Sequence, residues 1–238
     1  MIPPLSRSHF RHSFLILILV FTTIHGFSQT PSAPAAPATR FVVVLDAAHG
    51  GDDAGASLEG QPEKAFNLAM SIRLRSLLQA RGISVVTTRE SDATVDLLHR
   101  AEIANHAGAQ ACLTLHASET GAGVHLYTSP LAPRQPQLFE PWQTAQAAWI
   151  SRSVALEGVL NSALQHAGLT VILGRVATPA LDSMTCPAVA VEIAPGRQAG
   201  GASGPSVSGS LADPQYQAQV ANALAGALLE WRSEGSHL

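Results

Sequence analysis

Short apolar runs alternate with stretches of helical periodicity from Phe41 to the end of the chain, and few folds accommodate that alternation. Residues 41–45 (FVVVL) form an uninterrupted, mostly β-branched run, which is typical of a strand buried on both faces. Residues 63–81 instead repeat apolar side chains every three or four positions between a proline and Gly82, which indicates a helix. Further strands are expected at 83–87, 111–115, 123–127 and 187–193, and further helices at 95–107, 144–167 and 216–231. We therefore predict an α/β fold in a single domain, with a mostly parallel central sheet and helices on both of its faces.

Residues 1–28 have the properties of a secretory signal peptide. Arg7 and Arg11 supply positive charge, residues 13–24 form a short apolar segment, and small residues precede the expected cleavage site after Ser28. The apolar segment is shorter than the ~20 residues that span a bilayer. We therefore expect an exported protein, periplasmic or secreted, with no stable membrane span after cleavage. An uncleaved anchor is the alternative.

The rest of the chain is expected to consist of a linker and one folded domain. Residues 29–40 are rich in Pro and Ala, which predicts an extended tether, and the domain is expected to cover residues 41–235. Residues 194–214, rich in Gly, Ser and Pro, are expected to form an exposed loop. The net charge of −3, without any run of Lys and Arg, argues against a nucleic-acid partner. The domain is expected to be monomeric.

The two cysteines, Cys112 and Cys186, are too few for a disulfide scaffold or for a zinc site built from thiolates. Both lie in apolar segments without an adjacent basic residue that would lower a thiol pKa, so we do not expect a catalytic cysteine. In an exported protein they could form a disulfide, and two separate buried thiols are equally compatible with the sequence.

Polar residues fall where predicted strands end. His49 follows the first strand, His116 follows the strand at 111–115, and Glu192 lies near the end of the strand at 187–193. Ligands of open α/β sheets bind outside the carboxyl ends of the strands, so these side chains are expected to lie near one another. Glu63 is a fourth candidate, because a Gly-rich loop, residues 49–60, could fold the start of its helix back towards His49.

Two imidazoles and a carboxylate are a common set of ligands for catalytic zinc, which leaves the fourth coordination position open. A second carboxylate would then serve as the general base, and Glu192 suits this role because it ends a different strand. Each residue also has an ordinary structural explanation. His49 could be a solvated turn residue, His116 could cap a strand end, and Glu63 could be an acid favoured by the helix dipole.

Six short motifs in a fixed order narrow the interpretation. They are VVLDAAHGG at 43–51, Glu63-Lys64 with Asn67-Leu68, Thr88-Arg89, Arg100 with Ala104-Asn105, LHAS at 115–118 and PAVAVE at 187–192. Together they closely resemble the zinc N-acetylmuramoyl-L-alanine amidases of the type-3 family, over residues 41–193. The resemblance implies one Zn²⁺ per chain bound by His49, Glu63 and His116, with Glu192 as the catalytic glutamate. It also implies a peptidoglycan substrate, cut between N-acetylmuramic acid and L-alanine during wall remodelling or daughter-cell separation.

The chain departs from the family pattern at several positions. Ala48 replaces a glycine, which requires a negative φ at this residue. Ser118 stands where asparagine is common, and His125 stands at a position that is commonly acidic. The segment after Glu192 reads IAPGRQAGG in place of a Gly-Phe-Leu-Ser-Asn-like turn.

Two alternatives share these residues. One is a zinc hydrolase of another periplasmic amide or peptide, and the other is a wall-binding or regulatory homologue with little turnover. Any activator protein is unidentified.

Overall fold

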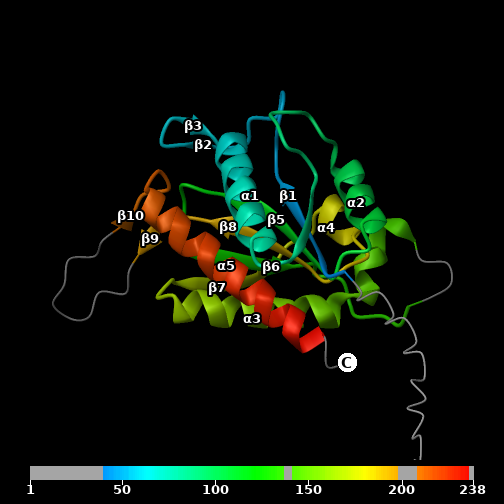
Figure 1. Cartoon of the computed structure of the whole chain (residues 1–238). Coiled ribbons are helices and arrows are strands. Elements are labelled where there is room, and N and C mark those ends of the chain that lie inside the picture. Colours follow the sequence, from blue (N-terminus) through cyan, green and yellow to red (C-terminus); the bar gives the residue numbers. More distant parts are fainter. Residues whose placement is uncertain (1–39, 137–140, 198–207, 236–238) are drawn as a thin grey trace, which may run out of the picture. The chain divides into compact units, whose positions relative to one another are not determined.

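A six-stranded sheet forms the centre of the fold in this computed structural model, which describes residues 40–136, 141–197 and 208–235 (Figure 1). The strand order is β4-β1-β5-β8-β6-β7. The strands are β4 Ser84–Thr87, β1 Val42–Ala47, β5 Ala111–Ala117, β8 Ala188–Ile193, β6 Val124–Thr128 and β7 Val171–Arg175. All neighbours pair in parallel except β6 and β8, which are antiparallel, so the predicted mostly parallel sheet is confirmed. The predicted signal peptide and nearly all of the predicted linker lie outside the described residues.

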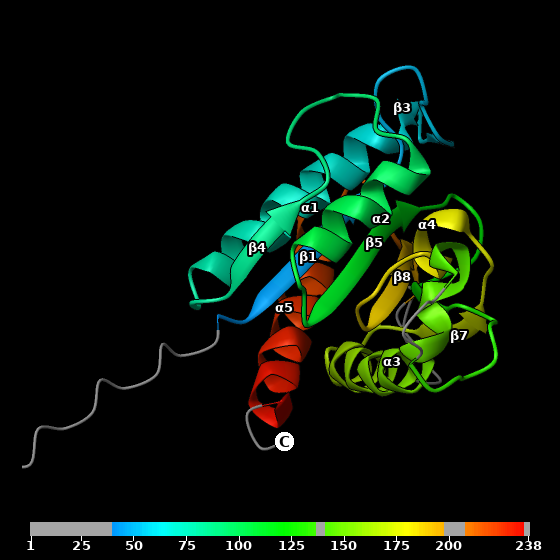
Figure 2. The same ribbon diagram turned by 90° about the vertical axis from the view of Figure 1, so that its right-hand side faces the viewer.

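Helices cover both faces of the sheet (Figures 1 and 2). They are α1 Glu63–Gln79, α2 Leu97–His106, α3 Ile150–His166, α4 Pro179–Asp182, α5 Pro214–Gly235 and the 3₁₀ helix η1 Trp142–Ala148. Two short hairpins, β2 Ser57–Leu58 with β3 Gln61–Pro62 and β9 Gly196–Arg197 with β10 Ser208–Gly209, complete the fold. Within the described residues, no helix is long and apolar enough to cross a membrane.

The sheet separates two cores of unequal size. Side chains of a strand alternate between the faces, so Leu113 and Leu115 of β5 enter the larger core, which α1, α3 and α5 complete. Cys112 enters the smaller core, with residues of α2 and α4. The shorter helices α2 and α4 cover this face of the sheet. Cys112, Thr114 and His116 alternate along β5, so the His116 side chain lies on the same face as Cys112. The candidate site is therefore built on the less covered face.

Two cysteines form a disulfide within the smaller core, which decides the question that the sequence left open. Cys112 is the second residue of β5, and Cys186 lies two residues before the start of β8. Because β5 and β8 pair in parallel, with Cys112 opposite Ala188, the two side chains reach each other across neighbouring strands.

Two predictions about local structure were wrong. The helix expected at 144–167 is divided at Trp149, where η1 ends and α3 begins. The loop expected at 194–214 is only partly exposed where the structure describes it, because Ala194 and Leu211 are buried and the ends pair as β9 and β10. Its middle, residues 198–207, lies outside the described residues.

Candidate metal centre

His49 lies two residues beyond the end of β1, in a backbone conformation that few side chains adopt. Its φ is +62°, in the left-handed region, which costs of order 1–3 kcal/mol for a residue other than glycine. The backbone bridge between Gly50 and Asp53 holds the turn. The carbonyl of His49 accepts a hydrogen bond from Arg100 at 2.8 Å. Among the described residues, His49 and Glu59 are the only residues other than glycine with a positive φ. Ala48 therefore has the negative φ that an alanine at this position requires.

Two buried arginines hydrogen-bond to the backbone at the end of β1. Arg89 donates to the carbonyl oxygens of Ala47 and Ala48, at 2.8 and 3.0 Å. Arg100 donates to the carbonyl of Ala47 at 2.7 Å and forms a buried ion pair with Asp46 at 2.8 Å. Planar guanidinium groups suit such multiple contacts. The arrangement therefore anchors the backbone on both sides of the turn that presents His49.

Glu63 is the first residue of α1, and its buried carboxylate accepts hydrogen bonds from separate parts of the chain. The backbone amides of Ala56 and Ala117 donate to it at 3.0 and 3.1 Å, and the Asn67 side chain donates at 3.1 Å. Asn67 is one helical turn further along α1, which places its amide beside the carboxylate. These contacts give Glu63 a single orientation.

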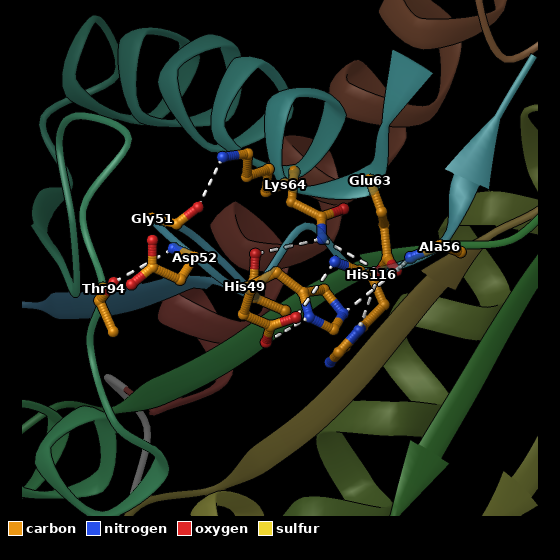
Figure 3. A network of polar contacts seen from close by, with 12 residues as sticks. His49, Gly51, Asp52, Ala56, Glu63, Lys64, Thr94 and His116 are labelled. Carbon is orange, nitrogen blue, oxygen red and sulfur yellow. Dashed lines mark hydrogen bonds and ion pairs between the residues drawn. The ribbon is translucent and has the colours of Figure 1, made fainter. Parts of the chain in front are cut away.

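His49, Glu63 and His116 meet at one point (Figure 3). The Glu63 carboxylate lies between the two rings, with Oε2 3.1 Å from Nε2 of His49 and Oε1 3.1 Å from Nδ1 of His116. The three ligand atoms lie within 4.8 Å of one another, and the rings meet edge to face. The structure thus brings together the three side chains that the sequence singled out.

Electrostatics favour an ionised carboxylate between the two rings. Burial acts to raise the pKa of Glu63, but hydrogen bonds with His116 and His49 and with two backbone amides outweigh it and hold the pKa far below its usual value. The same contact with Glu63 raises the pKa of His49, with a further contribution from Asp53. In this arrangement the site is a negatively charged group that two imidazoles already surround.

The donor set fits a divalent transition metal. Zinc bonds of about 2.0–2.1 Å place neighbouring ligand atoms roughly 3.4 Å apart, close to the two 3.1 Å separations found here. His49 also has the outer partner that metal-binding histidines usually have, because Asp53 lies 2.8 Å from its Nδ1 and leaves Nε2 for the metal. The group could therefore hold a metal ion.

Glu192 lies beside this group without belonging to it. It is opposite His116 in the parallel pairing of β5 and β8, so both side chains leave the same face of the sheet. Its Oε1 is 3.0 Å from Nδ1 of His125, which is opposite it on β6. In the sequence, His125 stands out as a departure from a family pattern and as the next candidate for the base after Glu192. Its contact with Glu192 depends on the antiparallel register of β6, for which the sequence gives no local signal.

A cavity of about 720 Å³ opens beside the candidate metal ligands. Its lining includes the polar residues His49, Asp53 and His116 and the apolar residues Leu97, Leu98 and Pro179. Leu97 and Leu98 are 51% and 43% exposed, so this apolar part of the lining is accessible. A substrate with both polar and apolar groups could therefore reach the site between α2 and α4.

Known N-acetylmuramoyl-L-alanine amidases are similar in sequence to this chain. The chain is 41% identical over 96 residues to the N-acetylmuramoyl-L-alanine amidase AmiA of Escherichia coli, an alignment that covers 40% of this chain and 32% of that protein. It is 26% identical to the germination-specific N-acetylmuramoyl-L-alanine amidase of Bacillus subtilis, over 93% of this chain and 94% of that protein. Several curated relatives are matched over only about a third of their length.

A solved amidase structure has a similar fold. The catalytic domain of the amidase CwlV from Bacillus (Paenibacillus) polymyxa var. colistinus superposes with a TM-score of 0.61 and 25% identity, over 81% of this chain and 98% of that one. The sequence model of the Amidase_3 family, described as N-acetylmuramoyl-L-alanine amidase, matches residues 43–230. That match takes in the sheet, the three converging side chains and Glu192, and so the chain belongs to the Amidase_3 family of N-acetylmuramoyl-L-alanine amidases.

Proposed function

We propose that this chain is a zinc-dependent peptidoglycan amidase, which hydrolyses the amide between N-acetylmuramic acid and L-alanine of the stem peptide. The convergence of His49, Glu63 and His116, within 4.8 Å of one another in a member of this family, carries the proposal. Export by the predicted signal peptide would bring the domain to its substrate in the cell wall. Its role there would be wall remodelling or the separation of daughter cells.

In the proposed site, His49, Glu63 and His116 would hold one Zn²⁺. When bound, zinc polarises the scissile carbonyl and makes water more acidic. Glu192 accepts a proton from the attacking water as the water oxygen bonds to the carbonyl carbon. Glu192 then gives that proton to the nitrogen of L-alanine as the carbon–nitrogen bond breaks. The products are a lactyl carboxylic acid on the sugar and a peptide with a free amino terminus.

Metal content tests the proposed ligands directly. The purified chain should contain about one zinc per molecule, and His49→Ala or His116→Ala should lose most of it, because two ligands remain. His106→Ala is the matched control, since His106 is an exposed histidine at the end of α2 whose ring contacts a backbone carbonyl. Retention of full zinc content by both ligand variants would contradict the site.

Hydrolysis of purified sacculi tests the reaction and the role of Glu192. Release of L-alanine amino termini and of intact stem peptides is expected, whereas a hydrolase of another amide would release different ends. Glu192→Gln keeps the size of the side chain and removes its basic oxygen, so the rate should fall by roughly 10²–10⁴-fold with zinc content unchanged. Loss of zinc together with activity would instead identify Glu192 as a ligand. Wild-type protein that binds sacculi and zinc without releasing peptides would support the wall-binding alternative.

A further inference from the structure

Three neighbouring strands place a row of polar side chains across the open face of the sheet. His116 on β5, Glu192 on β8 and His125 on β6 are opposite one another in the register of the strands. Opposite residues on paired strands leave the same face with their side chains close together. The row therefore runs from a candidate metal ligand, through the proposed base, to a second histidine that the proposed reaction does not use.

The contact between His125 and Glu192 has a definite direction. Nδ1 of His125 lies 3.0 Å from Oε1 of Glu192. An ionised carboxylate only accepts hydrogen bonds, so Nδ1 of His125 carries the proton and donates the hydrogen bond. In the described part of the chain, this is the only hydrogen bond given to the Glu192 side chain, which is 31% exposed at the end of its strand. Without it, the carboxylate would be free to change rotamer.

The His125 ring itself is held in place. The residue is 7% exposed, and Gly121 covers the ring so closely that a Cβ there would lie 2.6 Å from Cε1. Gly121 has a φ of +89°, so both its conformation and this contact favour glycine. The Tyr127 hydroxyl is 3.3 Å from the same Nδ1. A buried ring seated against a glycine presents its donor to Glu192 in a fixed direction.

We propose that His125 is a positioning residue, whose Nδ1–H fixes one oxygen of Glu192 and so aims the other at the attacking water. The inference rests on the proposed role of Glu192 as base. It also gives a function to a histidine at a position where the family pattern is commonly acidic. A second carboxylate there would repel Glu192, whereas an imidazole donor holds it.

The test separates the donor from the space that the ring fills. His125→Phe keeps a buried ring without a donor, His125→Asn keeps a donor near the position of Nδ1, and His125→Gln places its amide nearer to Nε2. With a soluble muramoyl-peptide substrate, His125→Phe should lower kcat roughly 10- to 100-fold, with KM and zinc content unchanged, because small errors in placing a catalytic group are costly. His125→Asn should recover more of kcat than His125→Gln.

His99→Phe is the matched control. His99 and Glu102 form the same kind of pair at 3.0 Å, but their side chains are 56% and 59% exposed on α2. This variant should keep wild-type kinetics.

A double-mutant cycle decides between positioning and an independent role. If His125 acts through Glu192, adding His125→Phe to Glu192→Gln should lower kcat little beyond Glu192→Gln alone. Multiplied losses would overturn the inference, as would an unchanged kcat in His125→Phe or equal recovery by Asn and Gln. If His125→Phe does not fold, the difference between Asn and Gln decides alone. Normal turnover in Glu192→Gln would instead remove the proposed role of Glu192 as base, and the inference with it, while the proposed function would stand.

Discussion

Glu157 is a carboxyl group on α3 that the proposed reaction does not use. Its burial costs the folded state stability. The residue is 6% exposed, and its Oε1 has no hydrogen-bond partner among the described residues. Burial raises the pKa of Glu157 above its ordinary 4.5, and attraction to Arg175 offsets only part of that effect. The folded state therefore favours the protonated form of Glu157 more than the unfolded chain does.

The sign of the pH dependence follows from this raised pKa. Below pH 4.5, Glu157 is protonated in both folded and unfolded chains and costs nothing. As the pH rises past 4.5, the unfolded chain ionises first, and the folded state loses stability until the pH passes the raised pKa. We expect Glu157→Gln to increase the melting temperature at pH 7.5 and to change it little at pH 4.

Glu230→Gln is the control for that measurement, because it removes the same charge from an exposed position on α5. It should leave the melting temperature nearly unchanged at both values of pH. An increase for Glu157→Gln that is equal at pH 4 and pH 7.5 would mean that the amide improves packing and that titration of Glu157 is not the cause.

At the level of single residues, the sequence predicted the candidate ligands better than their surroundings. His49 and His116 could be placed because strand ends of a parallel sheet meet at one edge, and the structure brings them together around Glu63. Their role as ligands stays a prediction. The contact of Glu192 with His125 could not be predicted, because it depends on the direction of β6. The burial of Glu157 depends likewise on how α3 packs.

The loop between β1 and α1 is the element that assembles the site, and at Gly55 it packs against two candidate ligands. A Cβ at Gly55 would lie 2.7 Å from both Oε2 of Glu63 and Cδ2 of His49, and the φ of Gly55 is +67°. The loop also hydrogen-bonds to the start of α1, where the amide of Glu63 donates to Ala56 at 2.8 Å. Glycine therefore lets the loop lie directly against two candidate ligands.

Gly55→Ala should weaken metal binding because the added methyl group pushes the loop, or the two side chains, out of place. Gly60→Ala is a close control, since Gly60 is in the same loop with a φ of +83° but has open space where the Cβ would be. Both variants carry the backbone strain, of about 1 kcal/mol, and only Gly55→Ala adds the clash. Zinc affinity measured by competition with a chelator should fall clearly more for Gly55→Ala. Equal affinities would show that strain alone matters.

Secondary-structure elements were predictable where burial gives them a regular pattern. The strands β1, β5 and β8 are nearly fully buried, and their apolar runs identify them. The edge strand β7 was not predicted, because its residues are half-buried or exposed and it is held mainly by pairing with β6. The two-residue hairpins and the four-residue α4 are too short to show any periodicity.

For the whole molecule, the fold class followed from the order of the elements, whereas the disulfide did not. Alternating strands and helices require a sheet covered on both faces, and the structure has this arrangement. Whether Cys112 and Cys186 meet depends on which strands are neighbours, and β5 and β8 are separated in sequence by β6, α3 and β7. The domain boundaries and the export signal stay predictions.

The disulfide closes a loop across 74 positions of the sequence, which encloses β6, η1, α3, β7 and α4. Restricting the unfolded chain to this extent contributes about 4 kcal/mol to the free energy of unfolding in the chain-entropy view. Replacing both cysteines with alanine should therefore lower the melting temperature by roughly 10 °C for a domain of this size. Hydrolysis at 25 °C should persist, because the sulfurs are bonded to each other in the smaller core and neither belongs to the candidate metal group. Reductant should lower the melting temperature of the wild type to that of the variant and leave the variant unchanged. A double variant that melts with the wild type would show that the cross-link contributes no stability, and one that folds but has lost hydrolysis would assign the sulfurs a part in the reaction.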